Sequence, residues 1–220
     1  MRRIPAKIIS PALRIFIKYY FKKPRKYSYK KIKGVVLPGV FFPQFTMSTK
    51  MLMDFITPLN LENKSVLELG CGTGLVSVLA AKKGAKVFSS DINPTAIKNA
   101  ELNAEKNGVK IVAIQSDLFE EIDSQIFDFI IINPPYYPKN PKNNAEKAWF
   151  CGKEFEYFEK LFLELAAYFN KQSQVLMILS EDCELTKIKA IANKNNIAFT
   201  QLAENKKWGE LTSIFQLQQK

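Results

Sequence analysis

Four consecutive residues near the middle of the chain, Asn133-Pro134-Pro135-Tyr136, could act on a flat ligand through hydrogen-bond acceptors. They follow the apolar run 129–132, which is typical of a buried strand. Asn133 offers a side-chain oxygen and Pro134 a carbonyl without an N–H, so acceptors meet few competing donors there. Tyr136 offers a ring on which a flat group can stack. The alternative is a rigid X-Pro-Pro turn that closes a strand, with Tyr136 as ordinary packing.

A second candidate site is the turn in "VLELGCGTG", where an apolar strand runs into Gly70, Gly72 and Gly74. Glycines at a strand-to-helix turn let the backbone approach a ligand closely, and the helix N-terminus faces that ligand. Asp91 stands twenty-one residues after Gly70, where an acid can accept hydrogen bonds from ribose hydroxyls. Together these features predict an adenosine-containing ligand. The alternative is that Asp91 merely caps the helix that follows.

The absence of histidine and the small number of cysteines exclude several kinds of catalytic and metal site. Histidine is absent, which removes the usual general acid or base near neutrality and a common metal ligand. The three cysteines, Cys71, Cys151 and Cys183, form no C-x-x-C pair. The sequence therefore predicts neither a disulfide framework nor a metal site, and it indicates a reducing cytoplasm. Cys151 is expected to be a small buried residue rather than a catalytic thiolate.

Positive charge is concentrated at the start of the chain. The net charge is +11, and residues 1–33 hold twelve Lys and Arg and no acid, whereas residues 34–220 hold twenty lysines against twenty-one acids. Interleaved tyrosines make this segment a candidate contact surface for RNA or the ribosome. An amphipathic helix on an anionic membrane, or a packed extension without a partner, are the alternatives. Arg14 and Lys18 interrupt the apolar runs, so neither a signal peptide nor a transmembrane helix is expected.

The elements that must position these residues alternate between strand-like and helical patterns from residue 61 onward. This alternation predicts an α/β fold with a doubly wound, mostly parallel sheet. The expected strands are 65–69, 86–92, 110–117, 127–133, 174–180, 197–202 and 211–218. The expected helices are 75–83, 94–107, 154–170 and 184–195. The last two strands are separated by "ENKKWGE", which is too short for a crossover helix and predicts an antiparallel hairpin.

Two parts are expected: a basic N-terminal extension over residues 1–45 and a catalytic domain over residues 46–220. In the extension, Ser10 and Pro11 are expected to begin a short helix, and a hairpin is expected in "RKYSYKKIKGVVLPGVFFP". Just after it, Met47, Met51, Leu52 and Phe55 share one face of a predicted helix, which indicates core packing.

A nicotinamide dehydrogenase also binds an adenosine-containing ligand and is the alternative enzyme. The G-x-G-x-x-G spacing of such dinucleotide enzymes is, however, absent from this glycine turn. "ELGCGTG" resembles instead the first motif of the class I S-adenosylmethionine (SAM) methyltransferases, and the resemblance covers residues 61–218 in strand order. It implies a Rossmann-like fold with seven strands and SAM as cofactor. It also implies that Glu68 and the glycines hold the methionine part, Asp91 the ribose and Asp117 the adenine amino group. The positions implied to bind SAM are Glu68, Gly70, Cys71, Gly72, Thr73, Gly74, Asp91, Ile92, Asp117, Leu118 and Asn133.

The segment 133–136 resembles the fourth-strand signature of methyltransferases that act on planar nitrogens, such as glutamine amides and the amino groups of adenine or guanine. Such a nitrogen is a poor nucleophile because its lone pair is delocalised. Acceptors aimed at its N–H bonds concentrate charge on it as it attacks the methyl group. The resemblance thus implies catalytic roles for Asn133, Pro134, Pro135 and Tyr136. No tuned base is needed, because the product nitrogen can release its proton to water.

Within this group the chain is most similar to the HemK-type protein glutamine methyltransferases. Beside the NPPY segment it shares their D-x-N-P step at 91–94 and their S-D-L-F-like strand end at 116–119. The resemblance implies a glutamine of a translation-related protein as the acceptor, with a base amino group of rRNA, tRNA or DNA as the alternative. A non-catalytic SAM-binding or membrane-surface module is a further alternative. The sequence departs from the release-factor enzymes, which carry a sizeable helical domain where this chain has about 45 residues.

The segment after the NPPY residues is expected to be a loop. Residues 138–153 show no periodicity, and a loop of this length beside a site is often a lid or a substrate reader. Trp149 and Phe150 are expected to pack this lid, with direct contact to substrate as the alternative.

Overall fold

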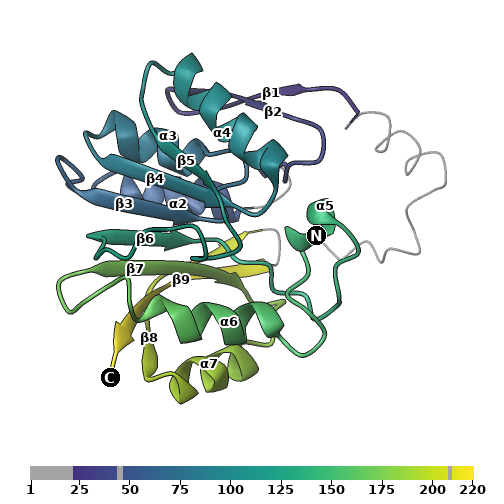
Figure 1. The fold of residues 1–220 in the computed structure, drawn as a ribbon, viewed down its shortest axis with the longest axis vertical. Helices are drawn as coiled ribbons and strands as arrows, with labels where there is room; N and C mark the ends of the chain where they lie inside the picture. The colour runs from purple at the N-terminus through teal and green to yellow at the C-terminus, as the bar shows by residue number, and fades with distance from the viewer. Residues whose placement is uncertain (1–21, 44–46, 208–209) are drawn as a thin grey trace.

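A seven-stranded sheet forms the centre of the molecule (Figure 1). The computed structural model describes residues 22–43, 47–207 and 210–220, so the helix expected at Ser10 lies outside it. The strand order is β5-β4-β3-β6-β7-β9-β8, and β9 runs antiparallel to both of its neighbours. The bounds are β3 (Ser65–Leu69), β4 (Lys86–Asp91), β5 (Val112–Gln115), β6 (Phe129–Ile132), β7 (Gln174–Ser180), β8 (Ile197–Lys207) and β9 (Glu210–Gln219). This topology confirms the predicted doubly wound sheet and its antiparallel C-terminal hairpin.

Helices cover both faces of the sheet. The helices α2 (Ser48–Ile56), α3 (Leu75–Lys82) and α4 (Pro94–Lys106) lie over one face, and α6 (Glu156–Leu165) and α7 (Leu185–Lys194) over the other. Neighbouring strand residues point into opposite cores: Val66 packs with α2 and α3, and Leu67 packs with α6. Because both faces are covered, β6 is an unbroken apolar run. No helix among the described residues is long and apolar enough to cross a bilayer.

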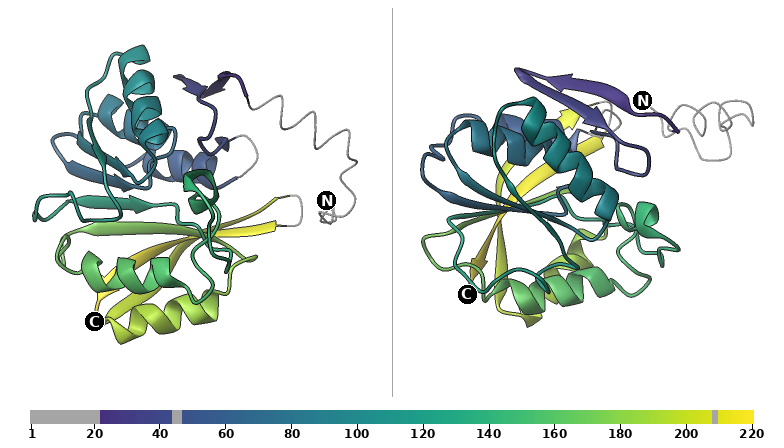
Figure 2. Two further views of the ribbon diagram at one scale, coloured as in Figure 1. Left: turned by 45° about the vertical axis from the view of Figure 1, so that its right-hand side comes forward. Right: turned by 45° about the horizontal axis from the view of Figure 1, so that its top comes forward.

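A two-stranded hairpin, β1 (Arg25–Tyr29) with β2 (Ile32–Val36), lies against α4 (Figure 2). Three asparagines at four-residue spacing hold it there, two on one face of α4 and the third at its C-cap. Asn99 and Asn103 bond to the backbone of residues 35 and 37, and Asn107 bonds to that of Lys33. Asn103 also donates to the carbonyl of Thr73 in the glycine turn at 2.9 Å. The hairpin is therefore fixed relative to that turn.

We expect Asn103→Ala to lower the free energy of unfolding by about 2–3 kcal/mol, because the part-buried N–H of Val35 and the carbonyl of Thr73 both lose their bond to this side chain. Asn107→Ala is the matched control: its bonds to Lys33 are exposed, and its loss is expected to stay below about 1 kcal/mol. Urea denaturation of both variants measures the difference. If both variants lost the same free energy of unfolding, burial of these asparagine hydrogen bonds would not determine how much they stabilise the protein.

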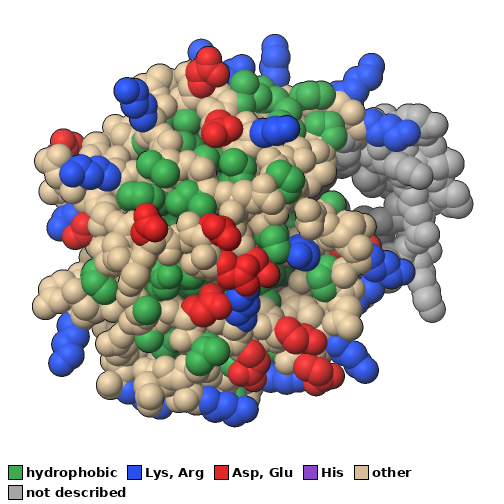
Figure 3. Space-filling model, viewed as in Figure 1, with side chains coloured by type: hydrophobic (Ala, Val, Ile, Leu, Met, Phe, Trp, Pro, Cys, Tyr) green, Lys and Arg blue, Asp and Glu red, His purple; other side chains and the backbone are tan. Residues whose placement is uncertain are grey.

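The hairpin also presents positive charge to the solvent. The exposed lysines within it and just before it are Lys22, Lys23, Lys26, Lys30, Lys31 and Lys33. Lys30 pairs with Asp54 on α2, with 2.6 Å between Nζ and Oδ1. In Figure 3, lysine and arginine side chains project from the upper edge, where the hairpin and α4 lie, whereas acids gather across the middle of that face. The described part of the basic segment thus forms a solvent-facing cationic surface.

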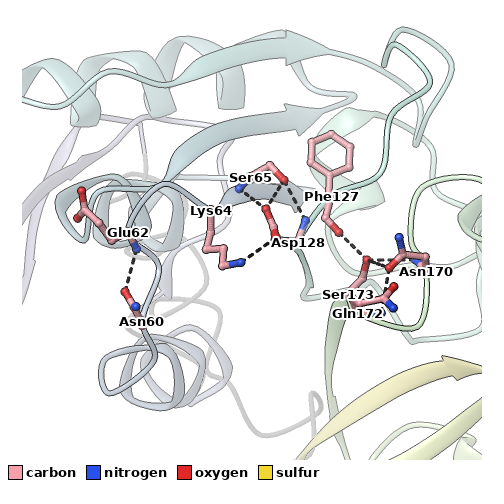
Figure 4. A network of polar contacts seen from close by, with 9 residues as sticks. All are labelled: Asn60, Glu62, Lys64, Ser65, Phe127, Asp128, Asn170, Gln172 and Ser173. Carbon is pink, nitrogen blue, oxygen red and sulfur yellow. Dashed lines mark hydrogen bonds and ion pairs between the residues drawn. The ribbon is translucent and has the colours of Figure 1, made fainter.

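A polar network ties the amino ends of the central strands together (Figure 4). Asp128 accepts hydrogen bonds from the backbone and hydroxyl of Ser65, both at 2.8 Å, and pairs with Lys64. Ser173 donates to the carbonyl of Phe127 at 2.7 Å. The bonds from Ser65, followed by Lys64, hold the pKa of Asp128 below its usual value. These polar contacts therefore fix the amino ends of the central strands. The carboxyl ends of the described strands, at the opposite edge of the sheet, carry no part of this network.

Several element boundaries differ from the sequence-based expectation. Helix α6 is shorter than the predicted 154–170: Phe155 takes a left-handed conformation with φ of +68° just before it. Beyond the helix end, the carbonyl of Tyr168 accepts a hydrogen bond from the N–H of Phe127. Strand β8 continues to Lys207, beyond the predicted end at residue 202, because its pairing with β9 resumes after a register shift. Strand β5 is shorter than predicted, and the loop 138–153 contains one short helix, α5 (Asn144–Lys147).

Candidate functional site

A cavity of about 570 Å³ lies at the carboxyl ends of the parallel strands. The chain moves outward from β3 to β5 and then returns to β6 beside β3, which makes this the switch point where such sheets bind ligands. Both motifs singled out in the sequence meet there. The predicted residues that line the cavity are Glu68, Gly70, Cys71, Gly72, Thr73, Asp91, Ile92, Asp117, Leu118, Asn133, Pro134, Pro135 and Tyr136. The volume lies within the usual range for a cofactor-sized ligand.

The glycine turn leaves room for a ligand against its backbone. Gly70 and Gly72 have φ of +74° and +52°, and a Cβ at either position would meet no protein atom within 4 Å. The N–H groups of Gly70 and Cys71 donate to the carbonyl of Ser90, which fixes the turn to the end of β4. The turn is therefore fixed in place and leaves open space against its backbone at Gly70 and Gly72.

Gly74 does not line the cavity. It has φ of +67° as the residue before α3, and a Cβ there would lie 2.5 Å from the Cβ of Ala100. The glycine instead allows the start of α3 to approach α4 closely. Its place in the motif thus serves helix packing, and we do not assign it a ligand contact.

Glu68 is buried beneath the turn at the end of β3. Its Oε2 accepts hydrogen bonds from both the N–H and the hydroxyl of Ser77, and Ser89 donates to that hydroxyl at 2.6 Å. Burial raises the pKa of Glu68 to about 7, although the bonds from Ser77 oppose this rise. A carboxyl group with this pKa changes charge near neutrality, at the edge of the cavity.

We expect the free energy of unfolding to fall as pH rises through 7, because Glu68 holds its proton more tightly when folded. Its pKa is 4.5 in the unfolded chain and about 7 in the folded protein, so its contribution is complete below pH 4.5 and lost above 7. A difference of one in pKa corresponds to about 1.4 kcal/mol, which sets an upper limit of about 3.5 kcal/mol. Urea denaturation at pH 5 and pH 8 should show a weaker pH dependence for Glu68→Gln. Identical pH profiles for both proteins would contradict this assignment.

Asp91 joins the turn to the end of β4. Its Oδ2 accepts from the N–H of Gly72 and its Oδ1 from the N–H of Asn93, each at 2.9 Å. Burial raises its pKa despite these bonds. Asn93, rather than Asp91, caps α4, since its side chain accepts from the N–H of Thr95. Each carboxylate oxygen of Asp91 keeps a lone pair that a ribose hydroxyl could use.

Asp117 and Leu118 lie just past the end of β5, at one end of the cavity. Lys160 of α6 pairs with Asp117, with 3.3 Å between Nζ and Oδ2, and also contacts Glu120. Leu118 has φ of +55° and is buried. Tyr157, one turn before Lys160, also lines the cavity, and burial raises the pKa of its hydroxyl. The phenol therefore stays protonated and can serve as a donor.

The NPPY segment begins directly after β6. The side chain of Asn133 donates from Nδ2 to the hydroxyl of Ser48, at 3.2 Å. The rings of Tyr136 and Tyr137 lie 4.8 Å apart between centroids. Tyr137 exchanges backbone hydrogen bonds with residues 149 and 151 of the loop, at 3.1 and 3.0 Å. The loop is therefore attached to the segment that presents Asn133.

The loop 138–153 forms part of the cavity wall. Trp149 packs against Phe41, with 4.9 Å between ring centroids, and both residues line the cavity. Trp149 is still 39% exposed, so packing and contact with a substrate are compatible for this side chain. Cys151 is buried, and burial raises its pKa to about 11, which fits the small buried residue expected from the sequence.

Several lining residues were not predicted from the sequence. They are Gly39, Val40, Phe41, Pro43, Ser48, Thr49 and Tyr157. The run "GVFFP" was expected to belong to the N-terminal hairpin, but the observed hairpin ends at Val36, and residues 39–41 and 43 line the cavity instead. Ser48 and Tyr157 gave no such signal, because a serine before a helix and a tyrosine on an amphipathic helix are both ordinary.

Comparison with known proteins places the chain among methyltransferases. The profile of the family described as "Methyltransferase small domain" matches residues 31–151. A Methanocaldococcus jannaschii protein, named as a candidate protein N5-glutamine methyltransferase, is 40% identical over 142 residues, 62% of this chain and 70% of that protein. The ribosomal RNA small subunit methyltransferase C of Buchnera aphidicola is 33% identical over 132 residues, 59% of this chain and 40% of that protein.

A solved structure shows the same fold. It is the E. cuniculi Mtq2–Trm112 complex, described as responsible for methylation of the eRF1 translation termination factor. It has a TM-score of 0.63 at 21% identity and covers 83% of this chain and 99% of that chain. Several curated relatives are much longer than the region they share with this chain, which spans 32–40% of their lengths.

Proposed function

The chain belongs to the methyltransferase small domain family, and we propose that it methylates a glutamine side-chain amide of a translation-related protein in the cytoplasm. Membership of the family and the fold confirm the resemblance to SAM-dependent methyltransferases seen in the sequence. The acceptor is the proposed part. It is supported by the relative with 40% identity, whose name specifies a protein glutamine, and by the amide-bearing segment 133–136 at the cavity.

The main structural support for this proposal is the position of Asn133. Its side chain stands at the carboxyl end of β6, beside the strand that leads into the glycine turn. Its Nδ2 is engaged by Ser48, which leaves the side-chain oxygen as the group available to a substrate. A glutamine amide presents N–H bonds that need such an acceptor.

Bound SAM supplies an electrophilic methyl group on a sulfonium that departs as a neutral thioether. The amide nitrogen of the acceptor contributes the electron pair of the new N–C bond and becomes positively charged. The oxygen of Asn133 and the carbonyl of Pro134 accept its N–H bonds and stabilise this charge. Tyr136 stacks on the flat amide and orients it. The product nitrogen then releases its proton to water, so no residue has to act as a tuned base.

We propose the following contacts for the cofactor. The turn 70–73 cradles the methionine part, the carboxyl group of Glu68 lies beneath that turn, and Asp91 accepts the ribose hydroxyls. Asp117, with Leu118 beside it, faces the adenine end. These roles are supported by the room above Gly70 and Gly72 and by the unused lone pairs of Asp91.

A base amino group of RNA is the second candidate acceptor. It is favoured by the exposed lysines of the β1–β2 hairpin, which could bind phosphates, and by the relative that is an rRNA methyltransferase. The hairpin leads directly into residues 39–43 at the cavity, so a nucleic acid or ribosome bound on it would lie beside the site. The same surface could hold a ribosome-associated protein substrate.

One experiment separates the two acceptors. The protein is incubated with methyl-tritiated SAM and a cell extract, and the products are digested in parallel with protease or ribonuclease. Label that becomes soluble with protease and survives ribonuclease supports the amide. Label released by ribonuclease alone replaces that proposal with a base amino group, and amino-acid analysis for N5-methylglutamine identifies the product.

A further inference from the structure

A hydrogen bond joins two cavity residues that lie 85 positions apart in the chain. The Nδ2 of Asn133 donates to the Oγ of Ser48 at 3.2 Å, and both residues line the cavity. Ser48 is the first residue of α2. It follows Met47, the N-cap residue of that helix.

Because of this bond, the nitrogen of the Asn133 amide contacts the protein and the oxygen is left toward the cavity. The nitrogen is engaged, and the oxygen accepts no hydrogen bond from the described residues. Among those residues the fully buried polar atoms without partners are the Tyr27 hydroxyl, Ser90 Oγ and Glu164 Oε2. The oxygen of Asn133 is not one of them, and it therefore keeps access to the cavity.

The orientation matters because an asparagine amide can rotate by about 180°, which exchanges the positions of its oxygen and nitrogen. With the oxygen in the cavity, the side chain accepts an N–H bond of the substrate; with the nitrogen there, it directs a donor at the same N–H bond. A partner that fixes one orientation removes this competition before the substrate arrives.

The position of Ser48 is itself fixed by packing. Helix α2 buries Leu52, Met53 and Ile56 against the sheet, and its contacts include β7. A hydroxyl at the start of so firmly packed a helix has little freedom to follow the amide.

We propose that Ser48 is a positioning residue that holds the Asn133 amide with its oxygen toward the methyl acceptor. This inference rests on the proposed function, in which Asn133 acts through that oxygen. It gives a residue of α2 a role beside the segment that follows β6.

The contact can be tested without any acceptor, by NMR of the full chain labelled with ¹⁵N. The Asn133 side-chain amide is assigned by its disappearance in Asn133→Ala. We expect Ser48→Ala to move these two proton resonances and to speed their exchange with water, whereas Ser48→Thr, which keeps the hydroxyl, leaves them near the wild-type positions. Lys50→Ala on the same helix is the control. Unchanged resonances in Ser48→Ala would overturn the proposal.

The catalytic consequence is tested by a double-mutant cycle, using methyl-tritiated SAM and the acceptor fraction found in the extract experiment. Loss of one orienting hydrogen bond should lower kcat about tenfold in Ser48→Ala, with little change in SAM affinity and recovery in Ser48→Thr. In the Asn133→Ala background, Ser48→Ala should have no further effect. Equal factors in both backgrounds would overturn the positioning role. If Asn133→Ala itself keeps its turnover, the proposed mechanism fails instead.

Discussion

Replacement of Asn133 by alanine is expected to lower kcat about 100- to 1000-fold, which corresponds to about 2.7–4 kcal/mol of transition-state stabilisation. In the proposed mechanism, the oxygen of Asn133 at the end of β6 accepts an N–H bond of the substrate as charge develops on the attacking nitrogen. The affinity for SAM should change little, because the glycine turn and Asp91 remain intact. Single-turnover kinetics with tritiated SAM and calorimetry with S-adenosylhomocysteine measure the two quantities separately.

Asn107→Ala serves as the control for this variant, because it removes an asparagine far from the cavity. A wild-type kcat in Asn133→Ala would remove the mechanism. A loss of SAM affinity equal to the loss of turnover would show that Asn133 binds the cofactor rather than acting on the acceptor.

The second large effect is expected at Gly74, where alanine should lower the free energy of unfolding by about 2–4 kcal/mol. A Cβ there would lie 2.5 Å from the Cβ and 2.8 Å from the Cα of Ala100, and φ is +67°. Helices α3 and α4 would have to separate to accept it, because neither contact involves a flexible side-chain end. Urea denaturation measures the loss.

Gly72→Ala is the matched control, since it places the same methyl group two residues earlier in the same turn. Its φ of +52° costs about 1 kcal/mol, but its Cβ meets no protein atom within 4 Å. We therefore expect a folded protein whose affinity for S-adenosylhomocysteine falls at least tenfold. If both variants lose stability equally and keep their affinity, the room above Gly72 is not a ligand site.

Much of the fold could be predicted from the sequence because local patterns and burial agree. The strands β3 and β7 begin and end where their apolar runs do, and the short connection before β9 gave the antiparallel hairpin. The glycine turn and the NPPY segment were also recognisable alone, because each motif is continuous in the chain. Their meeting at one cavity followed from parallel topology, in which all the carboxyl ends share one edge of the sheet.

Element ends were less predictable where tertiary contacts override local preference. The helical pattern of 154–170 continues well beyond the helix that forms, Glu156–Leu165. The buried, left-handed Phe155 sets one end, and the bond from Phe127 to Tyr168 lies beyond the other. Neither constraint is visible in the residues of the helix itself.

The residues alone indicated the class of chemistry: glycines and acids at fixed spacing for the cofactor, and acceptors without competing donors for a planar nitrogen. Which other residues complete the site became clear only from the way the chain packs. The Asn103 contact with Thr73, the Phe41–Trp149 pair and the Ser48–Asn133 bond each join distant segments. Such contacts leave no periodic signal, because a hydrogen bond or a ring contact depends on where two backbones are brought by packing and not on the spacing of residues along either one.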